Sequence, residues 1–327
     1  MVSHPTFDPS DIAKYLDEDA EDTTALVNRA VMGRYTPGSV FKIVTAAAAI
    51  RNISDISERK YECVGPLVFD ATTKKYLENV IVTAEQDTEE KAEQYKNYLF
   101  LRDYARDYHG ERTFEQAFAA SCNTSFGRIG MQVGSGLLLR MAESLGFNED
   151  FVFDEIMLYP SSFEEASTDV NVAWSAVGQY TDIVTPMHMC MISAMIANDG
   201  VMMEPKIMKR ITNARGYQIE SLKSEVFKTP LSKAEAETLR ELMYGVVKSG
   251  TGTGAKIKGY DVGGKTGTAE ITGKDGKNTT NAWFTGFIYD ENHPLAVAIV
   301  LENGSTGGKT AAPAAGKILK KALDYGY

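Results

Sequence analysis

Residues 248–269, KSGTGTGAKIKGYDVGGKTGTA, constrain the fold most, because two incompatible folds account for the same glycines and lysines. Gly259–Thr266 (GYDVGGKT) matches the P-loop pattern, in which a strand, a glycine-rich turn and a helix N-terminus hold phosphate groups. Lys265–Gly267 (KTG) is instead typical of a strand in acyl-transferring serine enzymes. The residues on either side decide between the two folds.

The flanking residues do not fit a P-loop, which needs a buried strand before the glycines and a helix after them. The preceding AKIKGYDV is short and half polar. The following TGTAEITGKDGK carries Gly267 and Gly273, which favours a strand that ends in a turn. The P-loop match is therefore interpreted as accidental, and a nucleotide-binding protein is kept only as a remote alternative.

Composition excludes several other classes of protein. The 327 residues are 43% hydrophobic and carry a net charge of -10, which allows a sizeable core and disfavours nucleic acid as a partner. The cysteines, Cys63, Cys122 and Cys190, have no C-x-x-C spacing and no histidine at the offsets typical of metal ligands. The spacing predicts neither a zinc site nor a disulfide framework, and we expect no metal and no organic cofactor.

Helix signals place two polar motifs at the ends of predicted helices. A proline and a glycine precede an apolar, alanine-rich run, which predicts a buried helix that begins near Ser39. Residues 113–116 (TFEQ) have the form of a capping box and open a second helix. The SCNTS that follows predicts a turn, so Ser121 and Asn123 are expected between two helices.

Three further segments have recognisable periodicity. Residues 231–247 predict an amphipathic helix, and residues 282–290 and 295–303 predict two strands joined as a hairpin. Residues 68–108 predict an acidic helical insertion, most clearly over 85–109, to which we assign no chemistry.

Ser39 and Lys42 have the spacing of a nucleophile and its base. Three residues apart on a helix, the two side chains share one face. Burial or a nearby positive charge would lower the pKa of Lys42 and let its neutral amine take the Ser39 proton. We expect Lys265 to supply the second positive charge, Ser121 to relay a proton, and Asn123 to hold a substrate amide.

The strand that contains Lys265 supplies the predicted substrate-binding residues. Thr266 and Thr268 alternate to one side of it and are predicted to bind a substrate carboxylate. Gly267 is predicted to let the substrate backbone approach closely. The backbone amides of Thr268 and Ser39 together form the predicted oxyanion hole.

Each motif alone also has a simpler explanation. Ser57–Lys60 repeats the S-x-x-K spacing in a charged stretch and is interpreted as surface. Lys248–Gly250 resembles the KTG motif, but it most simply ends the preceding helix. The order and the setting of the three motifs together favour a serine enzyme.

Four stretches are similar to one protein family. They are LVNRAVMGRYTPGSVFKIVTA, HGERTFEQAFAASCNTSFGRIG, VGQYTDIVTPMHMCMISAMIANDGVMMEP, and GGKTGTAE followed by AWFTGFI. With them the chain resembles the transpeptidase domain of class B penicillin-binding proteins over nearly its whole length. The resemblance implies an α/β fold of the α+β type: a mainly antiparallel central sheet flanked by helices, with a helical subdomain and Ser39 at their interface.

The resemblance also implies a domain organisation and a reaction. Residues 1–327 would form a single penicillin-binding transpeptidase domain without its N-terminal strands, pedestal domain and membrane anchor, located at the outer face of the bacterial cytoplasmic membrane. Ser39 would attack the D-Ala-D-Ala bond of a peptidoglycan stem peptide, release D-Ala and pass the acyl group to an amine. β-Lactam antibiotics would acylate the same serine, and cell-wall synthesis proteins are implied partners.

The sequence separates related activities only in part. A class A serine β-lactamase needs a glutamate for deacylation, and no Glu followed four residues on by Asn occurs between Asn123 and Lys265. A D,D-carboxypeptidase, which uses water as acceptor, stays open. A Ser-His-Asp hydrolase is disfavoured because G-x-S-x-G is absent and no histidine has an evident partner serine; the histidines are His4, His109, His188 and His293.

Overall fold

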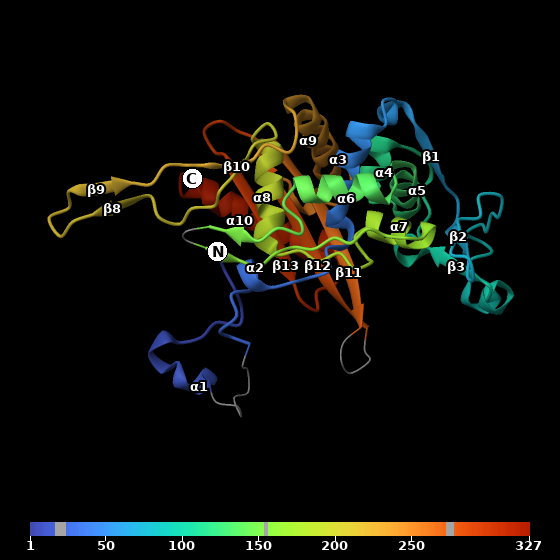
Figure 1. Cartoon of the computed structure of the whole chain (residues 1–327), viewed down its shortest axis with the longest axis horizontal. Helices are drawn as coiled ribbons and strands as arrows, with labels where there is room; N and C mark the ends of the chain where they lie inside the picture. The colour runs from blue at the N-terminus through green and yellow to red at the C-terminus, as the bar shows by residue number, and fades with distance from the viewer. Residues whose placement is uncertain (17–23, 154–155, 273–277) are drawn as a thin grey trace.

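The computed structural model describes residues 1–16, 24–153, 156–272 and 278–327 (Figure 1). The helices are α1 (Ala13–Leu16), α2 (Arg29–Met32), α3 (Lys42–Asn52), α4 (Phe114–Ala120), α5 (Asn123–Val133), α6 (Ser135–Ser144), α7 (Asp169–Ala176), α8 (Pro186–Ala197), α9 (Lys233–Lys248) and α10 (Ala312–Asp324). The strands are β1 (Lys60–Cys63), β2 (Leu67–Asp70), β3 (Tyr98–Leu101), β4 (Gly110–Thr113), β5 (Phe151–Val152), β6 (Met157–Leu158), β7 (Met202–Met203), β8 (Arg210–Thr212), β9 (Gln218–Ser221), β10 (Val226–Lys228), β11 (Val262–Thr272), β12 (Asn278–Ile288) and β13 (Leu295–Leu301).

The central sheet consists of β11, β12 and β13 in that order, and both pairs are antiparallel. The predicted hairpin of β12 and β13 is confirmed, with Ile288 opposite Leu295. The predicted strand through Lys265 is also confirmed, with Lys265 opposite Thr285. The turn predicted near Gly273 lies outside the described residues.

Helices cover both faces of this sheet, because its strands carry apolar side chains on both faces. Trp283 and Phe287 belong to the large core that also includes α3, α5 and α8, whereas Phe284 and Ile288 belong to a smaller core with α10. Helices α8 and α9 contact the sheet on the first face, and α10 contacts it on the second (Figure 1). The predicted α+β fold, an antiparallel sheet flanked by helices with a helical subdomain, is confirmed.

Helix α3 is buried on all sides where it leaves the active site. Residues 42–49 are buried, and the helix packs against α5, α6 and α9. Its small alanine side chains let these neighbours approach closely, and Thr45 satisfies its hydroxyl by donating to the Ala176 carbonyl at 2.7 Å. A short 3-10 turn, η2 (Gly38–Phe41), precedes α3, so the helical region begins where the sequence predicts.

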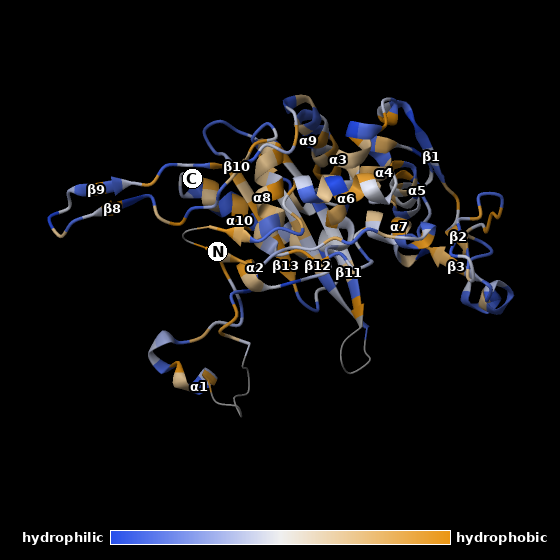
Figure 2. Cartoon of the chain, in the orientation of Figure 1, coloured by the Kyte–Doolittle hydropathy of each residue, from blue (hydrophilic) through white to orange (hydrophobic). Residues whose placement is uncertain are grey.

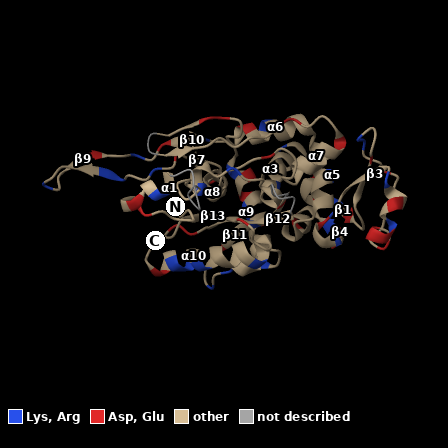
Figure 3. Ribbon diagram, turned by 90° about the horizontal axis from the view of Figure 1, so that it is seen from below, with Lys and Arg blue, Asp and Glu red and all other residues tan. Residues whose placement is uncertain are grey.

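The segment expected to be a helical insertion differs from the prediction. Within residues 68–108, β2 pairs with β3, and the charged stretch forms the short 3-10 helices η4 (Glu89–Tyr95) and η5 (Tyr104–Arg106) but no α-helix. The apolar run Tyr98–Leu101 pairs with Leu67–Asp70, and this tertiary contact outweighs local helix propensity. Figure 3 shows the acidic residues of this segment at one end of the molecule.

The outer segments are polar, in contrast to the centre. Figure 2 shows hydrophobic residues concentrated in α8, α3 and the sheet, while the β8–β9 hairpin that projects from the body is largely hydrophilic. In the described part of the chain, every helix is too short or too polar to cross a bilayer.

Candidate active site

Ser39 lies in η2, which rests directly on strand β11. Gly38 has a φ of 55°, and a Cβ at this position would lie 2.9 Å from the Thr268 carbonyl oxygen. A Cβ on Gly267 would lie 3.0 Å from the Pro37 carbonyl oxygen. Both positions therefore need glycine to bring Ser39 against the strand. In the structure the backbone that approaches Gly267 is that of Pro37, just before η2, and the approach of a substrate backbone stays a prediction.

The Lys42 amine lies at the centre of the site. Its Nζ is 3.1 Å from Ser39 Oγ and 3.3 Å from Ser121 Oγ. It also donates to the Ser121 carbonyl at 2.5 Å and to Asn123 Oδ1 at 2.6 Å. One amine thus joins the first two motifs.

Burial changes the basicity of both lysines. Lys42 is fully buried, and desolvation lowers its pKa to about 8, although the charge of Asp103 opposes part of this effect. Lys265 is also fully buried, and burial together with the charge of Lys42 holds its pKa well below the usual value. Near neutral pH the two amines together therefore carry fewer than two positive charges.

Ser121 connects the two lysines from a left-handed backbone position. It caps α4 with φ 59° and ψ 34°, a conformation that costs a non-glycine residue roughly 1 kcal/mol. Its hydroxyl accepts from Lys265 Nζ at 2.8 Å, so Ser39, Lys42, Ser121 and Lys265 form one continuous chain of contacts. The predicted capping box at Thr113 holds the other end of α4.

Asn123 is held by a segment to which the sequence assigned no chemistry. Its Nδ2 donates to the Arg102 carbonyl at 2.8 Å, and its backbone N–H donates to Asp103 Oδ1. Arg102 and Asp103 follow β3, within the segment interpreted as a solvated insertion. No spacing in the sequence indicates this contact, because β3 is brought here by its pairing with β2.

The edge of β11 that faces η2 carries the third motif. The Thr268 carbonyl accepts from Gln179 Nε2 at 3.4 Å, and in an antiparallel strand the N–H of one residue points to the same edge as its C=O. The Thr268 amide therefore points to the edge of β11 that lies away from β12. On the α10 face, Thr266 Oγ1 lies 2.5 Å from the hydroxyl of Thr251, a residue that the motifs did not indicate.

The competing motifs do not form sites. Gly259–Thr266 leads into β11 and not into a helix, so the residues lack the helix N-terminus of a P-loop. Ser57 is exposed on a separate 3-10 helix, as predicted, and Ser249 caps the end of α9.

The prediction that no histidine has a partner serine is wrong for His188. Its Nδ1 lies 2.7 Å from Ser161 Oγ, and its Nε2 lies 2.9 Å from the Leu145 carbonyl oxygen. Both side chains are fully buried, so the pair is closed to substrate and has a structural role.

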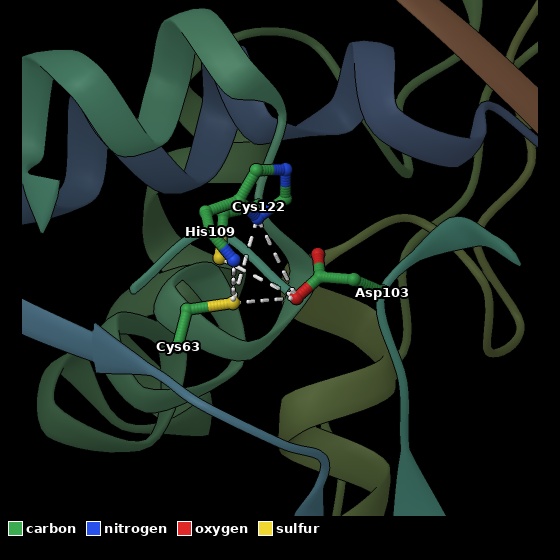
Figure 4. Close-up of side chains that lie close together, drawn as sticks. All are labelled: Cys63, Asp103, His109 and Cys122. Atoms are coloured by element: carbon green, nitrogen blue, oxygen red, sulfur yellow. Dashed lines mark hydrogen bonds and ion pairs between the residues drawn. The ribbon is translucent and has the colours of Figure 1, made fainter. Parts of the chain in front are cut away.

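The cysteine spacing predicted no metal-binding group, yet the fold brings such a group together. Cys63, Asp103, His109 and Cys122 offer ligand atoms that all lie within 4.8 Å of one another (Figure 4). Cys122 is the middle residue of the S-x-N motif, so this cluster adjoins the catalytic residues from behind.

Comparisons with known proteins agree with this geometry. The family model of the penicillin binding protein transpeptidase domain matches residues 1–58 and 71–320. Peptidoglycan D,D-transpeptidase PbpA of Mycolicibacterium smegmatis is 29% identical over 342 residues, which cover 100% of this chain and 64% of that protein. Stage V sporulation protein D of Bacillus subtilis is 29% identical, with 99% of this chain and 46% of that protein covered. The chain thus spans less than two thirds of the length of these relatives.

Solved structures show the same fold. The D,D-transpeptidase domain of a peptidoglycan glycosyltransferase from Eggerthella lenta has a TM-score of 0.82 and 30% identity, covering 99% of this chain and 74% of that one. Penicillin-binding protein A from M. tuberculosis, solved as an imipenem acyl-enzyme complex, has a TM-score of 0.79 and 26% identity, covering 98% and 69%. The chain belongs to the family of penicillin-binding protein transpeptidase domains, and its relatives are of class B.

Proposed function

We propose that this domain is a peptidoglycan D,D-transpeptidase, in which Ser39 forms an acyl-enzyme with a stem peptide that ends in D-Ala-D-Ala. The observation that carries the proposal is the 3.1 Å contact between Ser39 Oγ and the buried amine of Lys42. A lysine with a pKa of about 8 is neutral often enough near neutral pH to act as a general base. The similarity to the peptidoglycan D,D-transpeptidase of M. smegmatis supports the same reaction.

The hydrogen bonds around Lys42 set the direction of proton transfer. A neutral amine has two N–H groups and one lone pair. The two closest neighbours, the Ser121 carbonyl and Asn123 Oδ1, only accept, so they hold the two N–H groups. The lone pair is then left for the Ser39 hydroxyl. Lys42 takes the Ser39 proton as Oγ attacks the carbonyl carbon.

The leaving amine needs that proton when the peptide bond breaks. Ser121 Oγ lies between Lys42 and Lys265, at 3.3 and 2.8 Å. It can therefore pass a proton from Lys42 to the nitrogen of the departing D-Ala, and Lys265 stabilises the Ser121 oxygen during the transfer. The acyl group then passes to an amine of a second stem peptide.

The developing oxyanion requires donors at the edge of β11. The Thr268 amide points to this edge, where Gly38 brings η2 close to the Thr268 carbonyl. The amides of Ser39 and Thr268 form the proposed oxyanion hole, and a donor of this kind contributes about 3 to 4 kcal/mol to lowering the barrier.

The terminal carboxylate of the substrate is proposed to bind beside Lys265. Lys265 has no carboxylate partner among the described residues, so a bound carboxylate would favour its charged form. Thr266 and Thr268 follow it along the strand, and their hydroxyls are the proposed ligands of that carboxylate, with the substrate backbone passing Gly267.

We extend the proposal to the location and the partners of the domain. We place the domain at the outer face of the bacterial cytoplasmic membrane, where stem peptides occur, with β-lactams as inhibitors of Ser39. A penicillin-binding protein from Helicobacter pylori has been solved in a complex with MreC, and we propose a comparable cell-wall partner for this chain.

Intact-mass spectrometry after incubation with a penicillin tests the proposal. We expect an adduct equal to the mass of the drug that persists for hours, and its absence in Ser39→Ala. Ser57→Ala is the matched control, because it removes the serine of the other S-x-x-K stretch and should label normally. Lack of an adduct on the wild-type protein, or labelling of Ser39→Ala, would contradict the proposal.

The acceptor separates the remaining alternatives. Given a peptide that ends in D-Ala-D-Ala and an amine acceptor, a transpeptidase yields the cross-linked product, whereas a D,D-carboxypeptidase yields only the hydrolysed peptide. Rapid loss of the penicillin adduct with turnover of the drug would indicate a serine β-lactamase instead.

A further inference from the structure

The loop between α7 and α8 places one side chain on the edge of β11 that the substrate is proposed to occupy. Gln179 lies in this loop, and its Nε2 donates to the Thr268 carbonyl oxygen at 3.4 Å. The Gln179 backbone is itself held, because its N–H donates to the Trp174 carbonyl at 3.0 Å. The proposed reaction assigns Gln179 no role, yet this side chain reaches the strand that carries Lys265.

Gly178 fixes the position of this loop relative to Ser39. Its carbonyl accepts from the Gly38 backbone N–H at 2.9 Å, and a Cβ on Gly178 would lie 2.1 Å from the Gly38 carbonyl oxygen. Gly178 also has a φ of 78°, so this position needs glycine. Because Gly38 directly precedes Ser39, the start of the Gln179 side chain is fixed relative to the nucleophile.

The Thr268 carbonyl is also the acceptor that a bound substrate strand needs. In an antiparallel pair, two residues opposite each other at a hydrogen-bonded position exchange both of their N–H···O bonds. In the proposed complex the scissile carbonyl accepts from the Thr268 N–H. The same substrate residue, the first alanine of the D-Ala-D-Ala pair, should therefore donate its own N–H to the Thr268 carbonyl. Gln179 and the substrate thus need the same oxygen.

The surroundings of this oxygen leave room for one donor. A carbonyl has two lone pairs, but Gly38 covers one side of the Thr268 oxygen so closely that an added Cβ would lie 2.9 Å from it. The Thr266 carbonyl, two residues earlier, already accepts from Lys265 Nζ at 3.0 Å. The Gln179 bond is longer than the usual range of about 2.7 to 3.2 Å, so it is the one that a substrate N–H replaces.

We propose that Gln179 competes with the substrate for the Thr268 carbonyl and so determines which acyl donors react fast. This inference rests on the proposed function, because it takes the substrate to lie along the free edge of β11. While Gln179 holds the carbonyl, a donor that carries the N–H exchanges one hydrogen bond for another and gains little at this position. Gln179 is half-buried, so its amide can turn to water after release.

Two classes of β-lactam separate this contact from the rest of the site. A penicillin carries an acylamino group next to its β-lactam carbonyl, so it presents the same N–H as the substrate residue. A carbapenem carries a hydroxyethyl group there and has no such N–H. Both drugs acylate the nucleophilic serine and depend on Ser39 and Lys42, but only the penicillin needs the Thr268 carbonyl as an acceptor.

Acylation rate constants for benzylpenicillin and imipenem, measured by intact-mass spectrometry on the same protein, test the proposal. Gln179→Ala should react with benzylpenicillin about 2 to 10 times faster than wild type, which is the effect of one hydrogen bond, while its rate with imipenem stays within about twofold. Gln179→Met, which has a similar length and no donor, should show the same change in the ratio of the two rates. Gln218→Ala is the matched control, because it removes an exposed glutamine on β9 and should keep the wild-type ratio.

The ratio of the two rates does not depend on the fraction of each variant that is folded, so partial misfolding does not obscure the result. A slower reaction of Gln179→Ala with benzylpenicillin alone would show that Gln179 assists the substrate, and would overturn the proposal. An unchanged ratio, including equal changes with both drugs, would overturn it as well. Wild-type protein that reacts with neither drug would contradict the proposed function itself. Wild type that is acylated at Ser39, with an unchanged ratio in both variants, would refute only the role of Gln179.

Discussion

The acylation rate of Ser39 should follow the protonation of Lys42. Burial lowers the pKa of this amine to about 8, and only the neutral amine accepts a proton. A base with that pKa is neutral in about one molecule in eleven at pH 7 and in about ten in eleven at pH 9. We therefore expect the second-order rate constant for a fluorescent penicillin to rise about tenfold between these values and then level off.

The size and shape of this rise distinguish the possible causes. If Lys42 kept its usual pKa of 10.5, the rate would rise about a hundredfold between pH 7 and pH 9 and continue upwards. Because Lys265 is coupled to it, the measured midpoint belongs to the pair of amines. Lys42→Ala should lose the rise and react at least about a hundredfold more slowly, whereas Lys60→Ala should behave as wild type. A flat profile in the wild-type protein would refute the role of Lys42 as base.

Three further substitutions probe the packing around the site. In Gly267→Ala the new methyl group would lie 3.0 Å from the Pro37 carbonyl oxygen, so urea unfolding should show a loss of about 1 to 3 kcal/mol, and an unchanged midpoint would contradict this packing. Asn123→Ala removes the acceptor 2.6 Å from Lys42 Nζ and should slow penicillin acylation about a hundredfold; an unaltered rate would show that the amide does not position the amine. Burial lowers the pKa of His188 from 6.5 to about 4, so the native state resists protonation, and stability present above pH 6.5 is lost as pH falls towards 4, by up to about 3 kcal/mol. Between pH 6.5 and pH 4 the urea midpoint should fall more steeply with pH for wild type than for His188→Gln. An equal fall in the two proteins would contradict this effect of His188.

The catalytic residues were predictable where local sequence alone determines local structure. The proline and glycine before Ser39 start a helix, and S-x-x-K spacing then places the hydroxyl and the amine on one face. The capping box predicts where α4 begins, and the turn predicted after Ala120 puts Ser121 at the C-terminus of this helix. The strand through Lys265 was predicted from the glycines and the turn signal in TGTAEITGKDGK, and it pairs with β12.

Other parts of the site were not predictable, because they depend on pairing between distant segments. The charged stretch before β3 has helical spacing, yet Tyr98–Leu101 pairs with Leu67–Asp70 and turns Asp103 towards Asn123. The cysteine cluster is hidden for the same reason: Cys63 and Cys122 are 59 positions apart (122 minus 63), and neither has a nearby second ligand in the sequence. Spacing motifs detect sites within one element and miss those that tertiary contacts assemble.

The backbone at Ser121 explains why such distant contacts are needed. The chemistry requires a hydroxyl between two lysines at a helix end, where the left-handed conformation favours glycine. Glycine has no hydroxyl, so the site carries a cost of roughly 1 kcal/mol that the surrounding structure must offset. The contacts of Asp103 with the Asn123 backbone, and of Lys42 with the Ser121 carbonyl, hold this turn from both sides. Because the turn is fixed before substrate arrives, little rearrangement is needed when Ser39 reacts.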